Sequence, residues 1–269
     1  MICFILFFSG IVLTSSKETQ SADPSGEQNQ QLGHSDARQI KIIQNVSYAD
    51  TDNPRQQVDL FLPNTRMSDN PLPVIAFVHG GGWRKGSRRS GLPFLAPLVS
   101  TGKYIGVSIG YRLTDEATWP AQIHDCKAAI RWLRANAKTY HADPTKIIAV
   151  GTSAGGHLVA MLGTSGDVSA LEGQIGTFIN SSSRVSGVID FFGPANLTNM
   201  GGNHNNPDSP ESLLLGGPLL EQKEVAMAAS PVHYCSRDDP PFLIIHGTDD
   251  KLVPFEQSSQ LHKSLQNAG

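Results

Sequence analysis

The segment Gly151-Thr152-Ser153-Ala154-Gly155 has the pattern G-x-S-x-G, in which a serine can serve as a nucleophile. It follows an apolar run at 146–150 and precedes a helix-like stretch at about 154–162. A strand, a sharp turn and a helix are the context in which this pattern presents a serine hydroxyl above a sheet. Small residues leave room for the strained turn, and the first amides of the new helix face the reaction centre. We therefore predict that Ser153 is a nucleophile.

A second motif, His79-Gly80-Gly81-Gly82-Trp83, follows the apolar run at 74–78. Consecutive glycines allow backbone N–H groups to converge on one point, as an oxyanion hole requires. We expect the amides of Gly81, Gly82 and Ala154 to be the donors, and Trp83 to line the pocket wall. His79 lies on the wrong element to be a base, so we interpret it as a structural histidine.

The elements that must position these motifs alternate along the chain. Residues 121–137 carry apolar side chains at helical spacing, with a polar face made of Gln122, Lys127, Arg131 and Arg134. Glycine-rich and asparagine-rich stretches at 163–184 and 200–217 indicate long loops. Apolar or alternating runs predict strands near 42–48, 57–62, 74–78, 104–111, 146–150, 185–192 and 242–246. This order predicts an α/β fold, mainly a parallel sheet with helices on both faces, entered by an antiparallel hairpin.

Several separated motifs together resemble one superfamily. They are HGGGW at 79–83, Tyr111-Arg112-Leu113, GTSAGGH at 151–157 and DPPFLIIHG at 239–247. In this order they are similar to the α/β-hydrolases, and more narrowly to the hormone-sensitive-lipase-like carboxylesterases and the bacterial feruloyl and acetyl-xylan esterase-type (BD-FAE-like) group. The resemblance covers residues 40–269, and it implies an α/β-hydrolase fold that lacks its last strand and helix.

The resemblance also implies roles for particular residues. The acid of such a triad would be Asp250, the fourth residue after His246, with Asp249 as the alternative. Its role would be to orient the base and stabilise its charged form; the other reading of either aspartate is a turn residue that caps the next helix. The family order places the histidine base beyond Gly269. His262 lies on the helix that follows Asp250 and should not reach Ser153, and His157 is mispositioned on the helix that follows the serine.

The resemblance favours hydrolysis of carboxylic esters by acyl transfer, on short-chain or polysaccharide side-group (acetyl or feruloyl) esters. Two alternatives stay open at this point. Arylformamidases share the HGGxW and G-x-S-x-G arrangement and hydrolyse an amide. A hydrolase-fold binding module without turnover would result if the base were truly missing.

Composition limits the partners. Charged residues make up 17% of the 269 residues and the net charge is −3, which gives no electrostatic case for nucleic acid. Residues 1–22 have the pattern of a signal peptide followed by a polar linker at 23–39, so we expect a secreted or periplasmic protein without a stable membrane anchor. Cys126 and Cys235 match no metal pattern, and we expect two buried free thiols. The expected partner is a small-molecule or polysaccharide-linked ester, with no metal and no cofactor.

Overall fold

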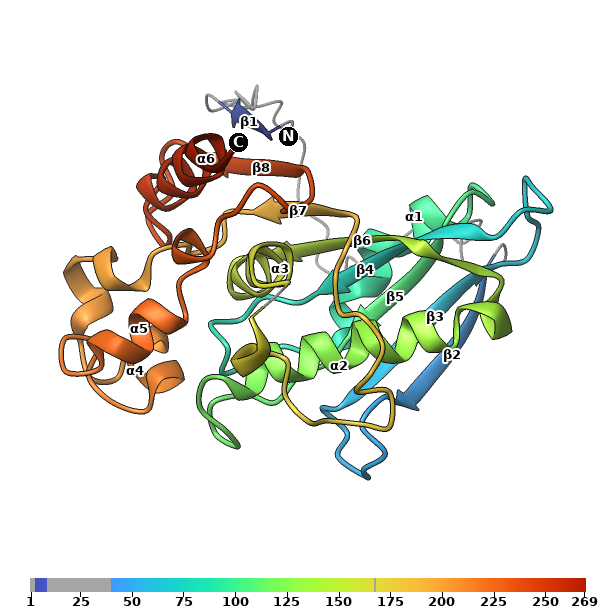
Figure 1. Cartoon of the computed structure of the whole chain (residues 1–269), viewed down its shortest axis with the longest axis horizontal. Helices are drawn as coiled ribbons and strands as arrows, with labels where there is room; N and C mark the ends of the chain where they lie inside the picture. Colours follow the sequence, from blue (N-terminus) through green and yellow to red (C-terminus); the bar gives the residue numbers. More distant parts are fainter. Residues whose placement is uncertain (1–2, 9–39, 167) are drawn as a thin grey trace, which may run out of the picture.

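The computed structural model describes residues 3–8, 40–166 and 168–269 of the chain, and these build one mixed eight-stranded sheet (Figure 1). The strand order is β1-β8-β7-β6-β4-β5-β3-β2, in which β2 pairs with β3 and β3 with β5 antiparallel, whereas the other pairs are parallel. The predicted hairpin entry and parallel centre are therefore confirmed. The strands are β1 (Cys3–Phe8), β2 (Ile40–Ser47), β3 (Gln57–Pro63), β4 (Leu72–Val78), β5 (Ile105–Ile109), β6 (Ala142–Thr152), β7 (Gly187–Phe191) and β8 (Phe242–Gly247).

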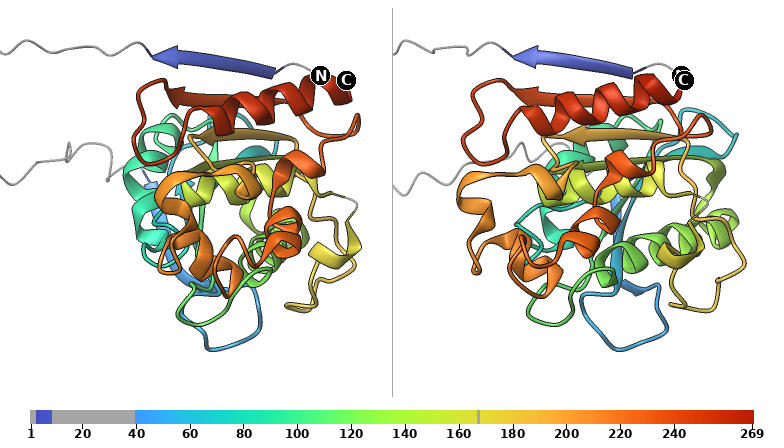
Figure 2. Two further views of the ribbon diagram at one scale, coloured as in Figure 1. Left: turned by 90° about the vertical axis from the view of Figure 1, so that its left-hand side faces the viewer. Right: turned by 60° about the vertical axis from the view of Figure 1, so that its left-hand side comes forward.

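Helices cover both faces of the sheet, as the sequence predicts. On one face α1 packs through Leu95 and Val99 against Phe77 and Val150 of the central strands. On the other face lie α2, α3 and α6 (Figure 2). These helices share one larger core, in which Leu261 and Leu265 of α6 are fully buried. The helices are α1 (Leu92–Val99), α2 (Ala121–Ala135), α3 (Ala154–Thr164), α4 (Pro210–Leu215), α5 (Lys223–Ala228) and α6 (Glu256–Ala268).

The amino-terminal strand comes from the predicted signal segment. β1 pairs in parallel with β8 from Cys3 against Phe242 to Phe8 against Gly247, and it forms one edge of the sheet. The rest of the predicted signal peptide and the polar linker at 23–39 lie outside the described residues, so both stay predictions. Within the described ranges, no helix combines the length and apolar character needed to cross a membrane.

The two predicted loops contain more structure than their composition indicates. Short 3-10 turns occur at Ser169–Leu171 and Gly202–Asn205, and the prediction of a continuous loop at 200–217 is wrong because α4 forms inside it. The hydroxyl of Ser209 caps this helix by accepting from the amide of Ser212, and Pro210 occupies a first-turn position that needs no amide donor. Figure 1 shows α4 and α5 on the side of the molecule away from β2.

Three residues of the predicted polar face of α2, Gln122, Lys127 and Arg131, are almost fully buried. Gln122 Nε2 donates to the Ala117 carbonyl at 2.7 Å, and the segment after α3 covers Lys127 and Arg131. Glu172 from this segment accepts from Lys127 Nζ at 2.6 Å and from Arg131 Nη1 at 3.0 Å. Buried cations are tolerated when they are paired in this way. One face of α2 therefore packs in the hydrophobic core, and the opposite face is buried against ion pairs with Glu172.

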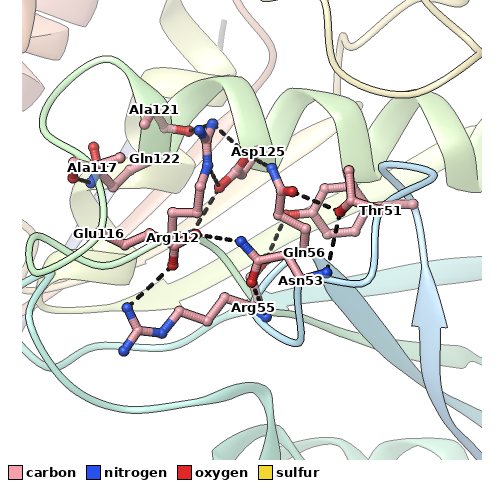
Figure 3. Close-up of polar contacts among 12 residues, drawn as sticks. Thr51, Asn53, Arg55, Gln56, Arg112, Glu116, Ala117, Ala121, Gln122 and Asp125 are labelled. Atoms are coloured by element: carbon pink, nitrogen blue, oxygen red, sulfur yellow. Dashed lines mark hydrogen bonds and ion pairs between the residues drawn. The ribbon is translucent and has the colours of Figure 1, made fainter.

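A second polar cluster joins the start of α2 to the β2–β3 connection (Figure 3). Asp125 is fully buried and accepts from the guanidinium of Arg112, from the Arg112 amide at 2.8 Å and from Gln56 Nε2 at 2.8 Å. Tyr111, the residue before Arg112, donates its hydroxyl to the carbonyl of His79 at 2.9 Å. The cluster therefore positions the chain that supports the glycine motif. Neither Cys126 nor Cys235 forms a disulfide within the described residues. Cys126 is buried as expected, whereas Cys235 is only half-buried and its Sγ donates to the Pro231 carbonyl at 3.6 Å.

Candidate active site

Ser153 occupies a strained turn between β6 and α3. Its backbone has φ 54° and ψ −120°, a left-handed region that side chains other than glycine avoid. The surrounding structure holds it there, because its amide donates to the Phe191 carbonyl at 2.9 Å and its own carbonyl accepts from His157 N at 3.0 Å. This is the strand–turn–helix geometry that the sequence predicts for an exposed nucleophile.

Close backbone contacts explain the small residues around this turn. A Cβ at Gly151 would lie 2.2 Å from the Gly155 carbonyl oxygen, and a Cβ at Gly155 would lie 2.1 Å from that of Val78. A Cβ at Gly80 would likewise lie 2.7 Å from the carbonyl oxygen of Thr152. The loop after β4 and the turn after β6 are thus in direct contact, which only glycine permits.

One cavity of about 360 Å³ joins the two motifs. Gly81, Gly82, Ser153 and Ala154 all line it, so the structure brings the predicted nucleophile and the predicted oxyanion donors to one place. Ala154 is the first residue of α3, where an amide has no partner within the helix. Such amides can stabilise a developing negative charge on a substrate oxygen beside Ser153.

Trp83 also lines the cavity, but its indole serves mainly as an anchor. The side chain is buried, and its Nε1 donates to His157 Nδ1 at 3.2 Å. The opposite ring nitrogen of His157 donates to the Ala229 carbonyl at 2.6 Å. Burial lowers the pKa of His157 to about 4, so the ring is neutral and unsuited to accept a proton from Ser153.

His79 has a structural environment, as we interpret it from the sequence. It is 2% exposed and stacks on Tyr111 with ring centroids 4.3 Å apart. Its Nδ1 lies 2.8 Å from the Gly80 carbonyl, and burial lowers its pKa to about 4. The ring therefore supports the start of the glycine loop.

The two candidate acids after β8 differ sharply in their surroundings. Asp249 is exposed and pairs with Lys251. Asp250 is partly buried; its Oδ1 accepts from the amides of Leu252 and Val253 at 2.7 Å and 3.0 Å, and both of these residues line the cavity. The structure thus holds Asp250 in a turn beside the cavity, while its catalytic role stays a prediction.

Two further histidines belong to the carboxyl-terminal region. His246 is engaged in this turn, with Nδ1 2.7 Å from Ser258 Oγ and Nε2 3.0 Å from the Val253 carbonyl. His262 lies on α6, as expected. The base expected after Gly269 lies outside the described residues.

Comparison with known proteins places this geometry in a family. The BD-FAE family model matches residues 58–265, which includes both motifs and the Asp250 turn. The chain belongs to the BD-FAE family. This membership, together with the sheet order and the strained serine, identifies the fold as an α/β-hydrolase fold.

Individual relatives of this BD-FAE member are esterases by name. Esterase LipQ of Mycobacterium tuberculosis is 34% identical over 199 residues, which cover 73% of this chain and 46% of LipQ. A solved structure described as a truncated form of carbohydrate esterase from gut microbiota has 33% identity and a TM-score of 0.78, covering 85% of this chain and 84% of that chain. Esterase Est2 of Thermogutta terrifontis has 29% identity and a TM-score of 0.66, covering 86% of this chain and 78% of that chain.

The curated relatives are longer than this BD-FAE chain. The matched regions are 46% of LipQ and 53% of Esterase LipC from the same organism, so the chain spans about half of their length.

The structure also adds residues that the sequence motifs did not reveal. His204 and Glu211 line the same cavity as Ser153, and His204 Nδ1 lies 3.0 Å from Glu211 Oε1. Both residues lie in the stretch interpreted as a long loop. The available signal was Ser209-Pro210-Glu211, a cap, a first-turn proline and an acid, which is typical of a helix start.

Proposed function

We propose that the protein hydrolyses carboxylic esters by acyl transfer through Ser153. The observation that carries this proposal is the strained Ser153 in one cavity with the amide-bearing residues Gly81, Gly82 and Ala154. Strain of this kind persists only where the surrounding structure enforces it, and it is concentrated at functional sites.

The reaction would proceed in two balanced steps. The Ser153 hydroxyl oxygen attacks the ester carbonyl carbon while a histidine base, expected after Gly269, takes the hydroxyl proton. The amides of Gly81, Gly82 and Ala154 hold the carbonyl oxygen as it becomes an oxyanion, and the alcohol leaves with the proton. Water then attacks the acyl-serine in the same manner and releases the carboxylic acid, which regenerates the serine.

Asp250 would orient the base. Its Oδ1 is saturated by two backbone amides, whereas its Oδ2 has a longer contact of 3.4 Å with His246 Nε2. We assign Oδ2 to the imidazole of the base, because a carboxylate oxygen accepts more than one hydrogen bond. Asp249 lacks this support and remains the alternative.

For the substrate we propose short-chain esters or side-group esters of polysaccharides, with acetyl or feruloyl as the acyl group. The support is the family, the similarity to a structure described as a carbohydrate esterase, and a cavity of moderate volume.

The test is covalent labelling of the full-length protein with a fluorophosphonate probe, followed by hydrolysis of p-nitrophenyl acetate, acetylated xylan and methyl ferulate. We expect Ser153 to be labelled, and Ser153→Ala to lose labelling and about 10⁶-fold in kcat. Ser181→Ala, a serine change far from the motifs in sequence, serves as the control. A folded full-length protein that neither reacts with the probe nor hydrolyses any of these esters contradicts the proposal and supports a binding module.

A further inference from the structure

The pair formed by His204 and Glu211 shares the cavity of Ser153 but has no part in the proposed acyl transfer. His204 lies in the 3-10 turn at Gly202–Asn205, and Glu211 lies in the first turn of α4. A Cβ at Gly82 would lie 3.2 Å from Pro210 Cβ, so the start of α4 touches the predicted oxyanion loop. The pair is therefore close to the place where an ester carbonyl would bind.

Hydrogen bonds fix the segment that carries the pair. The Ser209 hydroxyl donates to the His204 carbonyl at 2.7 Å and accepts from the Ser212 amide at 3.1 Å. The Ser212 hydroxyl donates to the Asn206 carbonyl at 2.8 Å. The pair is thus held in place without a ligand, as a preorganised binding group should be.

Glu211 has an unsatisfied hydrogen-bonding capacity. The residue is 4% exposed, and its Oε1 is paired with His204. Its second oxygen, Oε2, is buried and has no hydrogen-bond partner among the described residues. Buried carboxylate oxygens are normally paired, so each exception calls for an explanation. A group that enters the cavity and donates a hydrogen bond would supply the missing partner.

The chemistry of the pair selects the type of donor. A carboxylate oxygen accepts hydrogen bonds, so Nδ1–H of His204 donates to Glu211 Oε1, and Nε2 is the ring nitrogen that remains for a ligand. The pair consequently offers Glu211 Oε2 as an acceptor and His204 Nε2 as a second polar contact. Hydroxyl groups both donate and accept and therefore match these two atoms, whereas an acetyl group has no donor at all.

We propose that His204 and Glu211 form a subsite for free hydroxyl groups on the alcohol half of the ester, so that the preferred substrate is a partly acylated sugar. This inference rests on the proposed function and deepens it. His204 and Glu211 would then distinguish a sugar ester from a simple ester by binding the alcohol half of the substrate. Ser153 alone would carry out the attack on the ester carbonyl.

The test compares matched substrates on the full-length protein. Methyl β-xyloside monoacetate keeps free hydroxyls beside the ester, whereas the peracetylated xyloside and p-nitrophenyl acetate have none. We expect Glu211→Gln and His204→Gln to lower kcat/KM for the monoacetate about 10- to 100-fold. Values for the other two substrates should change less than about threefold. Glu224→Gln, the same charge change on exposed residue Glu224 of α5, should alter none of them.

A binding measurement gives a readout that does not need turnover. In a Ser153→Ala background, Glu211→Gln should weaken the affinity for the monoacetate measured by calorimetry and leave that for the peracetylated sugar unchanged. Equal losses of kcat/KM on all substrates, with unchanged melting temperature, would show that the pair acts on the reaction itself and overturn the subsite. An unchanged ratio of kcat/KM between the monoacetate and the peracetylated xyloside would overturn the proposed subsite as well. Failure of the proposed function is distinct, because the unmodified protein would then hydrolyse none of the esters, or Ser153→Ala would leave their hydrolysis intact.

Discussion

Ser153 shows how a single residue depends on its neighbours. Its φ of 54° is unfavourable for any side chain with a Cβ, yet the chain adopts it between a strand and a helix. Two backbone hydrogen bonds hold Ser153 in this conformation. The absence of Cβ atoms at Gly151, Gly155 and Gly80 lets the neighbouring backbone segments approach closely around it. Small residues at these positions therefore have a steric reason that can be tested separately from any catalytic one.

Gly155→Ala should disrupt the turn. The new methyl group would meet the Val78 carbonyl oxygen at 2.1 Å and the His79 carbonyl oxygen at 2.7 Å, and these backbone atoms leave it no room. Overpacking of a dense interior lowers the free energy of unfolding by about 1–3 kcal/mol. We expect the loss caused by Gly155→Ala to reach or exceed the upper value. Urea denaturation of the full-length protein measures the loss, and fluorophosphonate labelling of Ser153 should fall with it.

Gly187→Ala is the matched control. Gly187 also lies in the parallel sheet, but a Cβ there meets nothing closer than 3.7 Å, which is ordinary contact. The free energy of unfolding of the Gly187→Ala variant should change little or increase slightly, because alanine reduces the conformational freedom of the unfolded chain. Equal destabilisation by both changes would contradict the steric explanation.

At the scale of elements, α2 illustrates where sequence patterns succeed and where they stop. The apolar spacing predicts the helix within a few residues of its observed end at Ala135. The same pattern predicts the polar face, but it does not reveal that Glu172 and the segment after α3 close over Lys127 and Arg131. Charge pairing between distant segments leaves no local periodic signal.

The Arg112–Asp125 pair leads to a prediction for the same helix. Asp125→Ala would leave the Arg112 guanidinium without its carboxylate and would remove the acceptor of Gln56. Breaking a buried ion pair by removing one partner typically costs about 3–5 kcal/mol, and we expect a loss near the lower value since Arg112 is partly exposed. Thermal or urea unfolding measures it.

Asp115→Ala provides the comparison within the same network. Asp115 pairs with Arg55, but its side chain is 64% exposed. Exposed ion pairs contribute little to stability. The unfolding midpoint should therefore stay at the wild-type value, and a loss as large as that of Asp125→Ala would argue against burial as the cause.

For the molecule as a whole, the pH dependence of stability combines buried groups from both motifs. His79 and His157 have pKa values lowered by burial to about 4, below their ordinary value of 6.5. Between these values the unfolded chain binds more protons, so their contribution to stability is lost as the pH falls from about 6.5 to 4. Asp190 acts in the opposite direction. Burial raises its pKa from 3.8 to about 7, so stability decreases as the pH rises through that range.

The variant Asp190→Asn should separate the contribution of Asp190 to the pH dependence of stability from that of the two histidines. The amide keeps the shape and the oxygen that accepts from Gly193 N at 2.9 Å, but it does not titrate. The variant should gain stability relative to the wild type by about 1.4 kcal/mol per pH unit between pH 4 and 7. Urea denaturation of both proteins at several pH values measures the difference, in which the histidine contributions cancel. Parallel stability curves for the two proteins would refute a protonated Asp190.

The sequence alone predicts the strands β2 to β8, the helices α2, α3 and α6, the fold class, the elbow around Ser153 and the glycine loop at 79–83. These features are local, since apolar periodicity, turn residues and short motifs act on neighbouring residues. Only the tertiary structure decides which side chains from distant segments meet. It buries the polar face of α2 and attaches Trp83 to His157. It also bonds Asp250, and not Asp249, to the amides of the cavity-lining residues Leu252 and Val253, and it brings His204 and Glu211 into the cavity that Ser153 lines. Such contacts depend on how loops close over the sheet, which residue spacing along the chain does not encode.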